Sequence, residues 1–144
     1  MQVHHILKSK ANDAVVTVAS GTSISEAAKV LAEKRIGTVV ISNDGVEALG
    51  ILSERDIVRE LAARGAGCLS ETVDTYMTSK LVTCQRNNDA DDVLAKMTEG
   101  RFRHMPVVED GKMIGLITLG DVVKARLNEL AMEKNALEGM IMGH

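Results

Sequence analysis

The feature that most constrains the fold of this chain is an internal repeat. When the 144-residue sequence is shifted by 66 positions, Val16-Thr17 falls on Val82-Thr83 and Asp44-Gly45 falls on Asp110-Gly111. After one deleted residue a shift of 65 positions continues the match, pairing Gly50 with Gly115, Asp56 with Asp121 and Val58 with Val123. Repeats of this length are single supersecondary units that bury too little surface alone. We therefore expect two similar units packed together about a pseudo-twofold axis.

Each copy predicts the same order of elements. Apolar residues at helical spacing follow a capping residue in both copies: Ile24, Ala27, Ala28 and Leu31 in the first, and Ala90, Val93, Leu94 and Met97 in the second. Two strands joined by a tight Asp-Gly turn come next, at 37–42 and 47–52 in the first copy and at 104–109 and 112–117 in the second. A short strand before each copy, at 16–18 or 82–84, and a second helix after it complete a βαββα unit. The predicted fold class is therefore α+β.

Apolar spacing also predicts a short helical turn ahead of each unit, in the stretches VHHIL and VDTYM. The glycine-containing segment 65–70 is the predicted linker. These signals divide the chain into a first unit (1–66), a second unit (67–130) and a C-terminal helical extension (131–144).

The extension is predicted because helical apolar spacing outlasts the repeat. It runs through Val123, Leu127, Leu130, Leu137 and Ile141. An apolar stripe on a helix that extends beyond its own unit predicts a contact with a second copy of the chain. The alternative is that the helix folds back onto its own core.

Both copies carry the same corner where the last strand meets the second helix, GILSERD in the first copy and GLITLGD in the second. Taken alone, Ser53 with Asp56, or Thr118 with Asp121, forms a capping box that satisfies the amides at a helix start. The residues by themselves therefore leave a helix cap and a ligand site open as interpretations.

This order of elements, with a G-h-x-[ST]-x-x-D corner in both copies, resembles the cystathionine β-synthase (CBS) domain, which occurs as tandem pairs called Bateman modules. The resemblance covers residues 1–130. It implies two clefts that bind adenosine-containing ligands such as AMP, ADP, ATP, S-adenosylmethionine or NAD(H). It implies no catalytic activity, and the sequence contains none of the GxSxG, HExxH or GxxxxGK[ST] motifs of common enzymes.

The resemblance also implies the residues of each cleft. Asp56 and Asp121 would bind the two ribose hydroxyls, and Ser53 and Thr118 would reach toward a ribose or phosphate oxygen. We expect these short carboxylates to remain free for a diol because they reach their own cap amides poorly. The base would lie between apolar residues of the opening strand and of the last strand, which are Val16 with Ile51 in one cleft and Val82 with Leu116 in the other.

Phosphates would meet basic side chains, since a guanidinium matches phosphate oxygens in a bidentate way. The basic residues expected there are Arg103, His104 and Arg55, and a solvated surface position is the alternative for both arginines. Family members build each cleft from both units, so Asp56 would share a cleft with Arg103 and His104. Asp121 would instead face Gly37 and Thr38. We therefore expect the Asp56 cleft to take a charged nucleotide and the Asp121 cleft a less charged group.

Composition disfavours several other functions. The formal net charge is −3, with one Phe, one Tyr and no Trp, which is atypical of a nucleic-acid surface. No apolar run is long enough for a membrane span and no signal-peptide pattern opens the chain, so a cytoplasmic protein is expected. The two cysteines lack a CxxC spacing and His4-His5 lacks a third ligand, so we expect reduced thiols and no metal site.

The sequence thus favours a regulatory homodimer, joined through its units and its C-terminal helix, that binds an adenine nucleotide and signals to an unidentified protein target. The alternative is a structural, dimer-forming pair of units with empty clefts.

Overall fold

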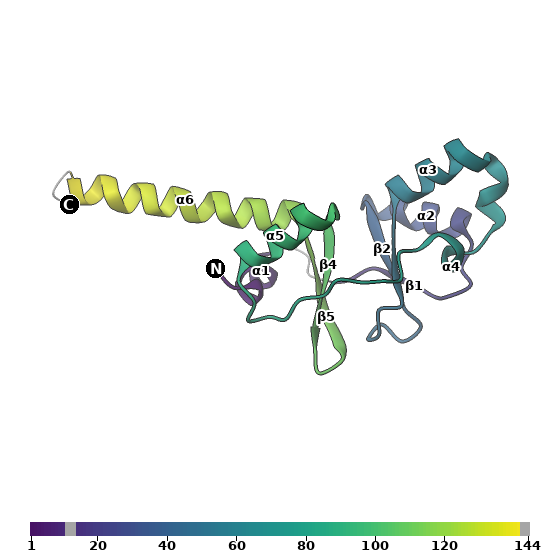
Figure 1. The fold of residues 1–144 in the computed structure, drawn as a ribbon, viewed down its shortest axis with the longest axis horizontal. Helices are drawn as coiled ribbons and strands as arrows, with labels where there is room; N and C mark the ends of the chain where they lie inside the picture. Colours follow the sequence, from purple (N-terminus) through teal and green to yellow (C-terminus); the bar gives the residue numbers. More distant parts are fainter. Residues whose placement is uncertain (11–13, 142–144) are drawn as a thin grey trace.

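A computed structural model describes residues 1–10 and 14–141 and shows two α+β units side by side, with one long helix projecting from the second (Figure 1). The first unit contains β1 (Thr17–Val18), α2 (Ile24–Lys34), β2 (Thr38–Ile41), β3 (Gly50–Ser53) and α3 (Glu54–Arg64). The second contains α5 (Ala90–Gly100), β4 (His104–Glu109), β5 (Lys112–Thr118) and α6 (Leu119–Ile141). Ahead of the units lie α1 (Val3–Ser9) and α4 (Val73–Tyr76), and the predicted linker forms the 3-10 helix η1 (Ala66–Ser70).

The first helix of each unit begins and ends at positions that the repeat aligns. The hydroxyl of Ser23 accepts the N–H of Glu26 at 3.1 Å at the start of α2, and Asp89 caps α5. Both helices end at an arginine in the left-handed conformation, Arg35 with φ 53° and Arg101 with φ 56°. The helices predicted from the apolar spacing are therefore confirmed.

The two sheets differ in their opening strand. The first has the order β1-β2-β3, with β1 parallel to β2 and β2 antiparallel to β3, whereas the second is the antiparallel pair β4-β5. The strand predicted at 82–84 is wrong, because only Cys84 bridges to β4. Val40 of β2 donates its N–H to Val16 at 3.1 Å, but the repeat aligns Val40 with Pro106, which has no N–H to give Val82.

The two hairpins also differ. In the second unit Asp110-Gly111 forms the tight turn that the sequence predicts, with φ of 50° and 76° at its two residues. The tight turn predicted in the first unit is wrong, because a longer loop joins β2 to β3. There the carboxylate of Asp44 accepts the N–H groups of Val46 and Glu47 at 2.8 Å each, which stabilises a wider loop.

The two segments that precede the units pack against the opposite units. α1 lies against β5 and α6 (Figure 1), and its Val3 and Ile6 are buried in the core of the second unit. α4 lies against β3, and its Val73 is buried in the core of the first unit. Packing therefore crosses the boundary predicted at residue 66, and the division into 1–66, 67–130 and 131–144 stays a prediction.

A glycine in β3 and another in β5 permit α1 and α4 to pack against these strands. A Cβ atom on Gly50 would lie 2.4 Å from the sulfur of Met77, and one on Gly115 would lie 2.9 Å from a methyl group of Leu7. Only glycine therefore lets the approaching side chain close over the sheet. A third apolar cluster, centred on Val40, Ile51 and Met113, joins the units.

The projecting helix α6 is packed only at its start. Val122 and Ala125 are buried, whereas Leu127 is 61% exposed, Leu137 is 59% exposed and Ile141 is 84% exposed. The helical extension is confirmed, and it does not fold back onto its own core. Within residues 1–10 and 14–141, no helix combines the length and the apolar character that a bilayer crossing needs.

Candidate functional site

Both corners form reciprocal capping boxes. In the first, the N–H of Ser53 donates to Asp56 Oδ2 at 2.9 Å and the N–H of Asp56 donates to Ser53 Oγ at 3.2 Å. In the second, the N–H of Thr118 donates to Asp121 Oδ2 at 3.0 Å and the N–H of Asp121 donates to Thr118 Oγ1 at 3.1 Å. The expectation that a short carboxylate would not reach its cap amide is therefore wrong. Each aspartate caps its helix through Oδ2, so its Oδ1 is not used by the cap.

The two carboxylates have different cationic partners. Asp56 Oδ1 accepts a hydrogen bond at 2.8 Å from Arg59, one turn along the same helix, so both of its oxygens are used. Asp121 Oδ2 lies 2.9 Å from Lys10 Nζ, which comes from the segment after α1. Asp121 Oδ1 accepts no hydrogen bond from the part of the chain that the structure describes. The second corner is therefore the one with an available carboxylate oxygen.

A cavity of about 280 Å³ lies beside this second corner, between the two units. Its volume is close to the lower end of the range of about 300–1,000 Å³ that is typical of small-molecule sites. The residues of its wall that matter here are Lys10, Val16, Gly37 and Thr38, and, from the second unit, His104, Leu116 and Thr118. The cavity combines apolar walls with a few polar groups, which is the usual character of a ligand site.

The cavity brings together some of the residues predicted for the clefts, in a different pairing. Gly37 and Thr38 face the second corner, as the sequence analysis expects. Val16 lies with Leu116 rather than with Ile51, which packs in the cluster between the units. Val82 is 42% exposed and does not line this cavity. The role of each residue as a ligand contact stays a prediction.

The three predicted basic residues do not all line the cavity. His104 lines the cavity beside Asp121, and its Nδ1 lies 3.3 Å from the hydroxyl of Thr38, so this histidine joins the two units. Asp121 and Asp56 both act on the imidazole of His104, so the expectation that it belongs to the Asp56 cleft stays a prediction. Arg103 and Arg55 are exposed, as their alternative assignment as surface arginines requires.

Lys10 is the charged cavity residue that the sequence analysis missed, together with the apolar Ala14, Val15 and Ile36. Burial raises the pKa of the Asp121 carboxyl, but the Lys10 ammonium and the Thr118 donors outweigh it and lower the pKa overall. A sequence signal existed, because LKSK before the first unit matches MTSK before the second and places Lys10 on Lys80. Only the fold shows which of the two lysines meets a carboxylate.

The half-buried imidazole of His104 predicts a pH-dependent stability. Burial lowers its pKa from the usual 6.5, aided by Arg103 and Lys10 and opposed by Asp121 and Asp56. The unfolded chain therefore binds the proton more tightly, so stability is fully present above pH 6.5 and falls as the pH drops through the folded pKa. Urea unfolding between pH 7.5 and 5 should show this loss, and His104→Gln should reduce it. The exposed His5→Gln control keeps the parent slope, and an unchanged slope in His104→Gln would contradict the assignment.

Comparisons with known proteins identify the fold. The family model of the CBS domain matches residues 6–63 and 73–128. The solved CBS-domain containing protein ATU1752 from Agrobacterium tumefaciens is 44% identical, with a TM-score of 0.82 over 88% of this chain and 99% of that one.

Two further solved structures are complexes with adenosine compounds. The CBS domain protein PAE2072 from Pyrobaculum aerophilum, complexed with AMP, is 26% identical, with a TM-score of 0.76 over 92% of this chain and 99% of that one. The CBS domain pair of MJ0100, in complex with 5′-methylthioadenosine and S-adenosyl-L-methionine, is 27% identical. Its TM-score is 0.77 over 90% of this chain and 98% of that one. Two curated relatives from Arabidopsis thaliana are each 30% identical to this chain. The chain spans 72% of the length of the CBS domain-containing protein CBSX3 and 22% of the length of CBSCBSPB5.

Proposed function

The chain belongs to the CBS domain family as a tandem pair, and from this premise we propose that it binds an adenosine-containing ligand beside Asp121 and signals occupancy to a protein partner. The observation that carries the proposal is the cavity between the units, which is lined by Thr118 of the second corner and by Lys10, the ion-pair partner of Asp121. Candidate ligands are AMP, ADP, ATP and NAD(H). Signalling requires that the ligand bind one conformation of the pair more tightly than another.

The chemistry of the cavity suits the adenosine that the ligands of the two neighbours share. Asp121 can accept hydrogen bonds from both ribose hydroxyls, through Oδ1 and by sharing Oδ2. Val16 and Leu116 offer apolar surface to a purine on opposite sides of the unit boundary. A ligand bound there contacts both units at once, which is what a sensor of their relative position needs.

Asp56 stays a second predicted ribose site. Its Oδ1 must exchange the hydrogen bond of Arg59 for a ribose hydroxyl. Because the Arg59 side chain is 63% exposed, that ion pair contributes little and can open at small cost.

Thermal unfolding in the presence of ligands tests the proposal. AMP, ATP, NADH and S-adenosylmethionine are each added at millimolar concentration, and at least one should raise the melting temperature. A ligand at a hundred times its Kd raises the free energy of unfolding by about 2.7 kcal/mol. Stabilisation by none of them would favour the alternative, a structural pair without a ligand. Chemical turnover of any of them would favour an enzyme.

We further propose that the functional unit is a homodimer. The groove between α2 and α3, about 450 Å³ and edged by the 64% exposed Val58, and the apolar stripe of α6 are both open to a second copy. Leu130→Glu combined with Leu137→Glu should reduce the mass measured by sedimentation velocity to that of a monomer. Met132→Glu, on the same helix but outside the stripe, is the control and should leave the dimer intact. A dimer unaffected by the double change would contradict the role of α6.

A further inference from the structure

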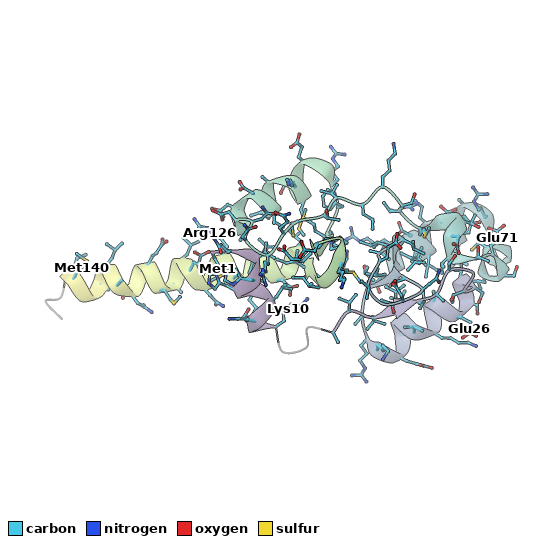
Figure 2. All side chains as sticks on the ribbon, turned by 90° about the horizontal axis from the view of Figure 1, so that it is seen from below. Met1, Lys10, Glu26, Glu71, Arg126 and Met140 are labelled. Carbon is cyan, nitrogen blue, oxygen red and sulfur yellow. The ribbon has the colours of Figure 1, made fainter. Side chains whose placement is uncertain are left out.

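Lys10 is held at the cavity by packed structure. Its Nζ lies 2.9 Å from Asp121 Oδ2 and donates a hydrogen bond at 2.9 Å to the backbone oxygen of Leu116. Its side chain is 20% exposed, and it follows directly after α1, beside the second unit (Figure 2). Val3 and Ile6 fix α1 in the core, which places the start of the Lys10 side chain beside the cavity, and the contacts with Asp121 and Leu116 hold its ammonium there.

Lys10 also determines the charge of the cavity. Among the described residues that line it, the only other ionisable side chain is that of His104, which burial keeps neutral near pH 7 by lowering its pKa. In the empty cavity the ammonium neutralises Asp121. When ribose hydroxyls donate to Asp121, the ammonium still has an N–H to give, since an ammonium carries three donors and two are used here. A ligand with a negative group gains this cation in a partly buried site, and a neutral ligand does not.

We propose that Lys10 is a specificity-determining residue that makes the cavity beside Asp121 select anionic adenosine ligands over neutral ones. The inference rests on the proposed function and deepens it. It reverses the expectation that this cleft takes the less charged group, because the cation comes from a segment outside the aligned basic positions.

The first corner shows how specific this arrangement is. Lys80, which the match of LKSK with MTSK places on Lys10, is exposed, and Asp56 pairs with Arg59 instead. The carbonyl of Ile51, the counterpart of Leu116, accepts the backbone N–H of Thr78 at 2.9 Å and so already has a donor. Lys80 therefore lacks both of the partners that hold Lys10, which makes it a matched control.

Titration calorimetry with AMP and with adenosine tests the assignment. The proteins are the parent chain, Lys10→Met, Lys10→Arg and Lys80→Met. In Lys10→Met the affinity for AMP should fall by about tenfold or more while that for adenosine changes less than about threefold, since only AMP carries the phosphate charge. Lys10→Arg should restore most of the selectivity, and Lys80→Met should match the parent.

The ratio of the two affinities is measured within each variant, so partial loss of folding affects both ligands equally. An equal loss for AMP and adenosine in Lys10→Met would make Lys10 a structural residue and overturn the inference. No loss for either would overturn it as well. If the parent chain binds neither AMP nor adenosine, the role of Lys10 is overturned. The proposed function itself fails only if, in addition, none of AMP, ATP, NADH and S-adenosylmethionine raises the melting temperature.

Discussion

Replacing Asp121 by Ala is expected to lower the affinity of the cavity for AMP by about a hundredfold or more. Each hydrogen bond from a ribose hydroxyl to a carboxylate contributes about 1.5–3 kcal/mol, and the substitution removes two. The same change removes the cap of α6, which costs about 0.5–2 kcal/mol of folding stability. Titration calorimetry measures the first effect and urea unfolding the second.

Asp56→Ala is the matched control because it breaks an equivalent capping box. It should cost a similar 0.5–2 kcal/mol, roughly, in folding stability while leaving binding beside Asp121 intact. If the first corner also binds a ligand, Asp56→Ala should bind one ligand per chain where the parent binds two. A parent-like affinity in Asp121→Ala together with lost binding in Asp56→Ala would place the ligand at the first corner, as the sequence analysis preferred.

Replacing Ile6 by Ala should destabilise the protein by about 2–5 kcal/mol, which is the usual cost of truncating a buried aliphatic side chain. Ile6 lies within the first ten residues, where terminal segments commonly tolerate change. Its side chain is nevertheless only 1% exposed and packs with Met105 and Ile117 in the core of the second unit. The free energy of unfolding in urea measures the loss.

Ile114→Ala provides the comparison for Ile6→Ala, because Ile114 is the same residue type and is 47% exposed. Its cost should stay below about 1 kcal/mol. If truncating Ile6 cost as little as truncating Ile114, α1 would not complete the second core, and the packing of α1 in the second unit would be wrong.

Local signals explain why the order of elements could be predicted from the sequence. Ser23 and Asp89 cap helices whose apolar residues recur at helical spacing, and these signals act within one or two turns. Because the same signals recur in both copies, each predicted helix or strand has support from two places in the sequence. The CBS pair fold follows from these local preferences together with the need of each small unit to bury its sheet.

The pairing of the two units could not be predicted in this way. Lys10 donates to the backbone oxygen of Leu116, 106 residues away, and Val16 lines the cavity with Leu116 rather than with Ile51. Because the two copies have similar local patterns, either partner satisfies the same apolar preference. The choice depends on tertiary packing, which places α1 against β5.

Pro106 is a signal that was present in the sequence and not used. The strand predicted at 82–84 relies on its resemblance to the first copy, yet a parallel ladder there needs an N–H that proline lacks. Asp44 likewise explains the wider loop of the first unit, since its carboxylate binds two successive amides. In both cases one side chain outweighs the symmetry of the repeat.

A small movement at the cavity produces a larger displacement at the far end of the projecting helix. α6 starts at the corner that contains Asp121 and continues for 23 residues, most of them beyond the body of the second unit (Figure 1). At about 1.5 Å per residue this is an arm of about 34 Å, so a tilt of about 5° at its first turn displaces the far end by about 3 Å. A sub-ångström adjustment around a bound sugar is thereby magnified, and a protein that grips the tip can sense it without touching the ligand.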